Sequence, residues 1–191
     1  HPMSPGRTTT VDLVAVEHDS KRLAYGVRDG GQDEREIRIR DLATGNDLPD
    51  RLPSALYDSV SFRRGGTGFY YGRRSRQTGA RIYFHKWGTS IELDTVIFGE
   101  GRAPTAFVTM TQAAEGRWFV FTVQHGWART EVFVQDAANA GPIVPVVTDA
   151  DARFYPRFVD GELWMRTDLD ASNNRLVAVD PANPSRERWR T

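Results

Sequence analysis

The stretch FYYGRRSRQTGARIYFHK at residues 69–86 contains two short apolar runs, FYYG and RIYFHK, which are separated by a polar segment ending at a glycine. Short apolar runs bounded by turn-forming residues predict β-strands, so this stretch predicts two consecutive strands. The first run has counterparts elsewhere in the chain: LAYGV, FYYGR, WFVFT and LWMRT begin at residues 23, 69, 118 and 163. Their spacing is 46, 49 and 45 residues, so the pattern recurs at a nearly constant period.

The strand that follows each of these runs keeps the same period. EIRIRD, RIYFHK, EVFVQD and RLVAVD place an apolar residue at positions 37, 82, 132 and 176, at intervals of 45, 50 and 44 residues. A period in the forties with about four short strands is typical of a propeller blade, whose sheet packs both faces against neighbouring blades. We therefore predict an all-β fold, a β-propeller of about four blades, each with four antiparallel strands.

The same pattern sets the expected organisation of the chain. We expect residues 1–10 to be a disordered tail or a cloning scar, and residues 11–191 to form a partial β-propeller domain. The four repeats are expected near 11–50, 51–100, 101–143 and 144–191. The predicted strands are 11–17, 22–27, 36–41, 59–62, 68–72, 81–86, 94–98, 106–111, 118–123, 130–136, 145–148, 154–159, 162–167 and 175–180.

A row of blades leaves two outer faces uncovered unless something closes it, because each blade needs a neighbour on both sides. Three arrangements remain open from the sequence. Four blades close on themselves, a second chain completes the ring, or the sequence is part of a longer ring. Self-association through the open blade faces is therefore among the partnerships that we consider.

The composition excludes several classes of protein. The 191 residues carry 25 Lys and Arg against 25 Asp and Glu, which leaves no overall field for nucleic acid or an anionic membrane, and we expect neither as a partner. The absence of cysteine excludes a disulfide framework, a thiolate metal site and a cysteine nucleophile. The chain shows neither a long apolar run nor a signal-peptide pattern, so we expect a cytoplasmic location, with a periplasmic one left open.

The segment LAYGVRDGGQDEREIRIRDLATGNDLPD at residues 23–50 resembles the N-terminal propeller of the prolyl oligopeptidase family, serine peptidases that cleave short peptides after proline. Four further stretches agree in order, at residues 59–73, 81–100, 115–126 and 146–189. The most specific elements are TGNDLPD, HKWGT, and TDLDAS followed by RLVAVD. In the family a seven-bladed propeller accompanies a C-terminal α/β-hydrolase domain with a Ser-Asp-His triad. The resemblance implies that this chain corresponds to roughly the second through fifth blades.

The resemblance also implies a function. We expect a non-catalytic propeller portion that gates the access of short proline-containing peptides to a hydrolase domain absent from this chain. No G-x-S-x-G nucleophile elbow occurs in the sequence, so we assign no catalytic residue and expect no hydrolysis by the chain alone. We expect no cofactor. The alternative is a stand-alone propeller scaffold that binds a protein or peptide through its loops.

Four residues are candidates for lining the substrate path. The resemblance places Tyr57, in LPSALYDSVSF, where the family has a substrate-lining aromatic residue, usually Phe. It places Phe107 at a lining apolar position where Met is familiar, and Trp127 in a loop near the substrate. Gln124 stands where some members have Arg. Alternatively, Tyr57 and Phe107 contribute to ordinary packing between blades, and Trp127 covers the edge of a blade.

Other polar groups are expected to have structural roles. His85 and His125 lie on alternating strands, where a hydrogen-bonded histidine is commoner than a metal ligand, and we predict no metal site. Asp168 and Asp170 are typical of turns. The arginine-rich segments at residues 63–66 and 72–76 form local basic patches, for which we favour a solvated blade edge or an interdomain salt-bridge surface over an RNA site.

Overall fold

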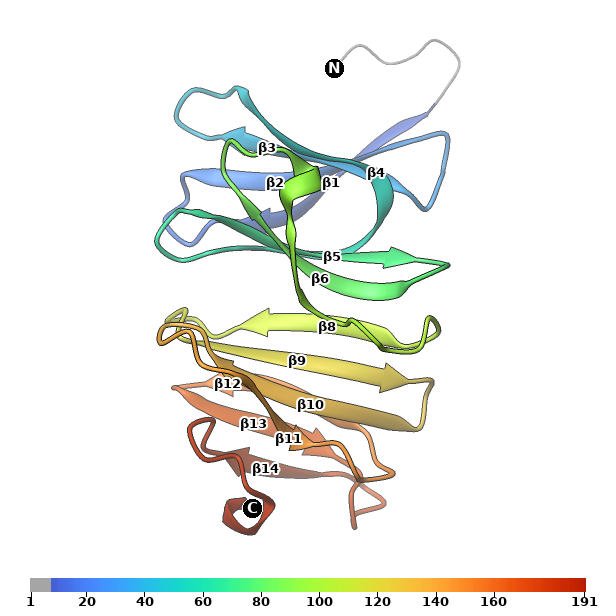
Figure 1. Ribbon diagram of the computed structural model, residues 1–191, viewed down its shortest axis with the longest axis vertical. Coiled ribbons are helices and arrows are strands. Elements are labelled where there is room, and N and C mark those ends of the chain that lie inside the picture. The colour runs from blue at the N-terminus through green and yellow to red at the C-terminus, as the bar shows by residue number, and fades with distance from the viewer. Residues whose placement is uncertain (1–7) are drawn as a thin grey trace. The chain divides into compact units, whose positions relative to one another are not determined.

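The computed structural model describes residues 8–191, and these residues form almost entirely antiparallel β-structure (Figure 1). The chain divides into two compact units, the first ending at Gly101 and the second beginning at Arg102. Most of the expected tail at residues 1–10 lies outside the described residues. Thr9 and Thr10, however, pair with Asp29 and Arg28, so regular structure begins before residue 11.

The first unit is a run of seven strands in which each strand pairs with the next one along the chain. Every pairing is antiparallel, as expected for strands joined by short turns. A short 3-10 helix, Ile91–Leu93, precedes the last strand. The strands are β1 (Thr9–Val16), β2 (Arg22–Asp29), β3 (Arg35–Asp41), β4 (Asp47–Phe62), β5 (Gly68–Ser75), β6 (Gly79–Lys86) and β7 (Thr95–Phe98).

Strand β4 is 16 residues long and serves two blades. Its first half pairs with β3 between Asp47 and Ala55, and its second half pairs with β5 between Leu56 and Phe62. The first half is therefore the outer strand of one four-stranded blade, and the second half begins the next blade. The sequence predicted only residues 59–62 as a strand. The rest of β4 was not predicted, because prolines at positions 49 and 53 argue against a strand. An outer strand nevertheless tolerates proline, since its free edge needs no N–H donor.

The two blades of the first unit bury a shared core. Ile37, Ile39 and Leu52 of the first blade are fully buried and belong to one cluster with Phe69 and Tyr71 of the second. Strand β5 is buried without interruption from Gly68 to Gly72, which fits a strand packed on both faces. The apolar runs of the sequence are therefore the inner strands of the blades, as the repeat pattern indicated.

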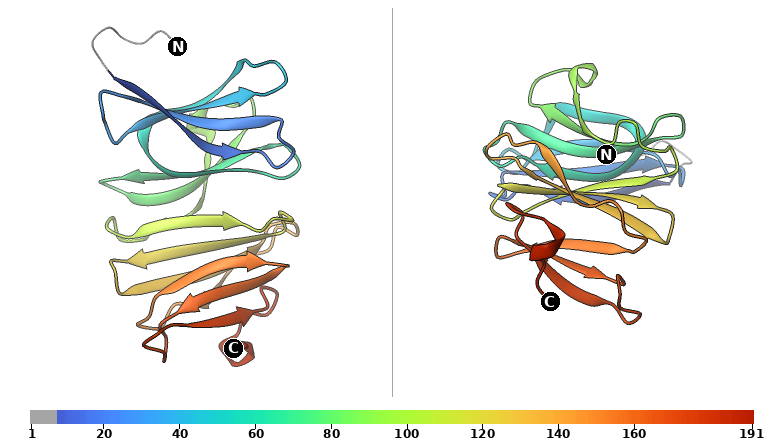
Figure 2. Two further views of the ribbon diagram at one scale, coloured as in Figure 1. Left: turned by 180° about the vertical axis from the view of Figure 1, so that it is seen from behind. Right: turned by 60° about the horizontal axis from the view of Figure 1, so that its bottom comes forward.

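The second unit contains one four-stranded and one three-stranded sheet, whose hairpins are seen from two further directions in Figure 2. The four-stranded sheet consists of β8 (Phe107–Gln112), β9 (Trp118–His125), β10 (Arg129–Asp136) and β11 (Ile143–Val147). The other consists of β12 (Phe154–Val159), β13 (Glu162–Thr167) and β14 (Arg175–Val179), and a 3-10 helix follows at Arg186–Arg188.

The last sheet corrects the expectation of four strands in every blade. Beyond β14, Arg190 and Ala178 exchange two backbone hydrogen bonds of 2.8 and 3.0 Å, forming an isolated antiparallel bridge. This bridge lies where a fourth strand would pair. The segment PANPSRERW before Arg190, which contains prolines at positions 181 and 184, pairs with β14 only through this bridge.

The two sheets of the second unit also share one core. Val120, Val132 and Val134 of the first sheet join Leu163 and Met165 of the second in a single buried cluster. The chain is thus a partial β-propeller with two blades in each unit, which confirms the predicted fold class. Within residues 8–191, no helix has the length and apolar character needed to cross a membrane.

Candidate functional site

Three of the four predicted lining residues lie at one end of the sheet formed by β8 to β11. Phe107 begins β8 and is directly opposite Gln124, near the end of β9, so their side chains lie on the same face of the sheet. Trp127 lies in the turn between β9 and β10, where Gly126 has a φ of 63°. Trp127 is 95% exposed and Phe107 is 45% exposed. This end of the blade therefore presents two large aromatic side chains to its surroundings.

A charged cluster fixes the turn that carries Trp127. Glu131, which is 7% exposed, accepts hydrogen bonds from Arg102 at 2.7 Å and Arg129 at 3.1 Å, and His125 Nε2 lies 2.9 Å from the same carboxylate. Arg129 also donates to the carbonyl of Thr148 at 2.6 Å. These contacts join the segment before β8, the β9–β10 hairpin and the end of β11. The sequence predicted a hydrogen-bonded structural role for His125, which agrees with this contact. It did not predict the partners, because the members of the cluster become neighbours only across strands.

Tyr57 belongs to the first unit and has a different environment. Its side chain is 5% exposed, and its hydroxyl donates a 2.6 Å hydrogen bond to the carbonyl of Pro53. Its ring meets that of Tyr71 edge to face, with centroids 5.9 Å apart. The phenol therefore packs within the core of its own unit, and its lining role remains a prediction.

Burial of Tyr57 leads to a prediction about alkaline stability. Burial raises its pKa from 10 to about 12, because the phenolate is poorly solvated there, and burial also raises the pKa of Tyr71. The folded pKa lies above the unfolded value, so the stabilisation from the neutral phenol is complete below pH 10 and is lost as the pH rises toward 12. We expect the urea midpoint to fall across this range. Tyr57→Phe should reduce that dependence and leave the part due to Tyr71, whereas an unchanged slope would contradict the assignment.

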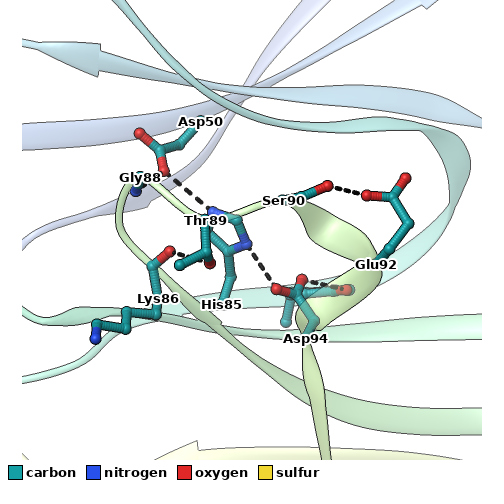
Figure 3. A network of polar contacts seen from close by, with 9 residues as sticks. Asp50, His85, Lys86, Gly88, Thr89, Ser90, Glu92 and Asp94 are labelled. Atoms are coloured by element: carbon teal, nitrogen blue, oxygen red, sulfur yellow. Dashed lines mark hydrogen bonds and ion pairs between the residues drawn. The ribbon is translucent and has the colours of Figure 1, made fainter.

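The best-defined buried polar site surrounds His85 (Figure 3). His85 Nδ1 lies 2.8 Å from Asp94 Oδ1, and His85 Nε2 lies 3.1 Å from Asp50 Oδ1. The side chains of all three residues are at most 7% exposed. Asp94 also accepts a hydrogen bond from the Tyr71 hydroxyl at 2.8 Å, and Asp50 accepts one from the Gly88 N–H at 2.6 Å. We call these five residues the His85 network.

The network joins two blades. Asp50 comes from the half of β4 that completes the first blade, whereas His85 lies on β6 and Asp94 directly precedes β7 of the second. Both ring nitrogens of His85 lie at hydrogen-bond distance from a carboxylate oxygen. A neutral imidazole has a single N–H and can donate only one of these hydrogen bonds. The other needs either a second proton on the ring or a proton on the carboxyl group. The network therefore holds the HKWGTSIELD loop against β4. Within residues 8–191, no group of three acidic or histidine side chains has an arrangement that could hold a metal ion.

Comparison with known proteins identifies the family to which these blades belong. A family model described as the prolyl oligopeptidase N-terminal β-propeller domain matches residues 2–191. The chain belongs to the prolyl oligopeptidase family. The resemblance to this family that the sequence suggested is thereby confirmed. The HKWGT motif contributes His85 and Gly88 to the His85 network.

Similarity to individual proteins agrees with this assignment. A prolyl endopeptidase from Elizabethkingia meningoseptica is 27% identical over 194 residues, which cover 96% of this chain and 27% of that protein. Protease 2 from Moraxella lacunata is 29% identical over 160 residues, which cover 82% of this chain and 22% of that protein. The chain thus spans about a quarter of the length of these relatives.

Solved structures show the same fold. A structure from a study of two prolyl endopeptidases superposes with a TM-score of 0.87 at 22% identity, over 96% of this chain and 28% of that one. Oligopeptidase B from Leishmania major superposes with a TM-score of 0.77 at 16% identity, over 92% of this chain and 26% of that one. Because the sequence identities are only 22% and 16%, these two superpositions are evidence for a shared fold and for nothing more.

Proposed function

We propose that this part of the propeller gates the access of short proline-containing peptides to an α/β-hydrolase domain of the same protein. The observation that carries the proposal is the exposed pair of aromatic side chains, Phe107 and Trp127, at one end of a blade whose turn is fixed by Glu131. Exposed large apolar groups on a rigid support are typical of contact sites for ligands or partners.

The chemistry of this end suits an extended peptide. The ring of Trp127 offers an apolar surface for the flat, hydrocarbon side of a proline residue. Gln124, directly opposite Phe107, carries an amide that can both donate and accept hydrogen bonds with a peptide backbone. Packed blades exclude folded proteins by size, so a peptide would reach the hydrolase domain only as a short, flexible chain. Tyr57 would support its blade from within rather than present a free hydroxyl.

The proposal predicts that Trp127 contributes to substrate binding. The test uses a longer protein that contains both this propeller portion and the hydrolase domain. In that protein, Trp127→Ala should raise the KM for a short proline-containing peptide by about tenfold and leave kcat nearly unchanged, because a binding contact is lost. Leu93→Ala is the matched control, since Leu93 is 71% exposed and lies in the other unit. The kinetic constants of both variants would be measured with the same peptide.

Three results would overturn the proposal. They are an unchanged KM in the Trp127→Ala variant, an equal rise in the Leu93→Ala variant, and turnover of the peptide by the purified 191-residue chain alone. A stop codon directly after residue 191 would instead favour the stand-alone scaffold, which could be tested by searching for a bound protein or peptide.

A further inference from the structure

A pocket of about 500 Å³ lies within the second unit, at the opposite end of its first sheet from Trp127. It is formed by the turn between β8 and β9 and by the turn between β12 and β13. Strand β9 separates the two ends, because it begins at Trp118, a lining residue, and ends at His125, just before the turn that carries Trp127. The pocket is therefore distinct from the aromatic end considered above.

Both turns that form this pocket have a defined backbone. In the first, the N–H of Ala113 donates to the carbonyl of Trp118 and the N–H of Gly116 donates to the carbonyl of Ala113, each at 2.8 Å. In the second, Asp160 and Gly161 have φ values of 49° and 81°, as in the two-residue turns that join tightly paired strands. The walls of the pocket are thus held by hydrogen-bonded strands, which favours a preformed site.

The lining of this pocket carries an excess of negative charge. Its charged side chains are two acids, Glu115 in the first turn and Asp160 in the second, and one base, Arg117. Arg117 already has a partner outside the lining, because its guanidinium donates hydrogen bonds of 2.8 and 3.1 Å to Asp136. Glu115 and Asp160 are both exposed, and within residues 8–191 neither carboxylate forms a hydrogen bond or an ion pair.

The surroundings of Arg117 add to this excess. Hydrogen bonding to Asp136 raises the pKa of Arg117, and the negative charges of Glu115 and Asp180 raise it further. Together with Asp160 of the opposite turn, carboxylates therefore outnumber the single guanidinium group in and beside the pocket. This charge favours a cationic ligand over an anionic one.

The pocket also has an aromatic wall. Phe158 lines it and is only partly buried, although this side chain also packs against the core of the unit. Trp118 is 7% exposed, and the guanidinium group of Arg117 lies over its ring, 4.9 Å from the centroid. Arg117 is thus held between Trp118 and Asp136, and Phe158 is the aromatic group that a ligand can reach.

We propose that this pocket binds a small organic dication, such as a linear diamine. Its two ammonium groups would pair with Glu115 and Asp160, which stand on different turns, and the hydrocarbon chain between them would lie against Phe158. The volume lies in the range of small-molecule sites. An inorganic cation fits less well, because it would leave the aromatic wall without a contact. In addition, no group of three acidic or histidine side chains in the described part of the chain is arranged to hold a metal ion.

The test is a calorimetric titration of the 191-residue chain with the diamine putrescine as the probe. We expect saturable binding at one site that weakens as sodium chloride is added, because salt screens the charges. Replacing both acids, Glu115→Gln with Asp160→Asn, should weaken binding by about tenfold or more, since two charge-assisted hydrogen bonds are lost. Asparagine tolerates the positive φ of position 160, so the turn should be kept, which circular dichroism would verify.

A second double variant is the control. Asp149→Asn with Asp151→Asn removes the same charge from exposed positions at the other end of β12, and it should change the affinity by less than about twofold if the site is local. Equal weakening in both double variants would overturn the proposal in favour of a general charge effect. Absence of saturable binding would also overturn it. So would displacement of putrescine by an equal concentration of calcium ions, which would indicate an inorganic cation site, or equal binding of the uncharged diol of the same chain length, which would show that the carboxylates play no part.

Discussion

Replacing Asp94 with alanine is expected to lower the free energy of unfolding of the first unit by about 3–5 kcal/mol, the typical cost of removing one partner from a buried charged network. The side chain of Asp94 is 2% exposed and accepts hydrogen bonds from both His85 and Tyr71. Its loss would leave the Tyr71 hydroxyl and a His85 nitrogen buried without an acceptor. Water cannot replace the carboxylate readily, because Phe69 packs on the imidazole with ring centroids 4.9 Å apart.

The measurement is amide hydrogen exchange of β5 and β6, which reports the stability of this region separately from the second unit. Glu92→Ala is the matched control, because Glu92 lies two residues earlier in the same loop and is exposed; its effect should stay within about 0.5 kcal/mol. Tyr71→Phe should cost about 1 kcal/mol, since a single hydrogen bond is removed. Equal exchange rates in the Asp94→Ala and Glu92→Ala variants would show that the His85 network contributes no stability.

The sequence predicted most of the strands because their signal is local. All fourteen predicted segments overlap a strand of the structure, and the apolar runs at residues 69–72 and 118–123 are inner strands. The prediction failed for outer strands, which pair with only one neighbouring strand. The first half of β4 contains two prolines, and the last sheet has a single bridge at Arg190 in place of a fourth strand. An outer strand is under weaker sequence constraint than an inner one, so periodicity alone does not define it.

The candidate site was less predictable, because its contacts join residues that are distant in the sequence. The repeat pattern cannot show that Asp50 lies beside His85, 35 positions away, or that Glu131 gathers three basic groups. Nor does alternation along β4 show that the hydroxyl of Tyr57 is already bonded to Pro53. The resemblance named Phe107 and Gln124 separately as lining candidates, and only the structure shows that strand pairing places them opposite each other.

Phe154→Ala is expected to destabilise the second unit by about 3–5 kcal/mol, because it removes a large side chain from a closely packed core. Phe154 is 1% exposed and belongs to the cluster that both sheets of this unit share. The ring of Trp189 meets it edge to face at a centroid distance of 6.1 Å, which adds a specific aromatic contact to the buried area. Urea unfolding of the second unit, followed by circular dichroism, would measure the loss.

Tyr155, the next residue along β12, provides the control for the Phe154→Ala variant. Tyr155 is 42% exposed and lies under the guanidinium group of Arg166, 4.4 Å from the ring centroid. Consecutive strand residues point to opposite faces of a sheet, so Tyr155→Ala should cost only about 1 kcal/mol or less. A large difference between these neighbours is expected only if one face of β12 packs on the preceding sheet and the other does not. Equal losses would contradict the packing of two blades in the second unit, and with it the physical basis for reading these repeats as parts of a propeller.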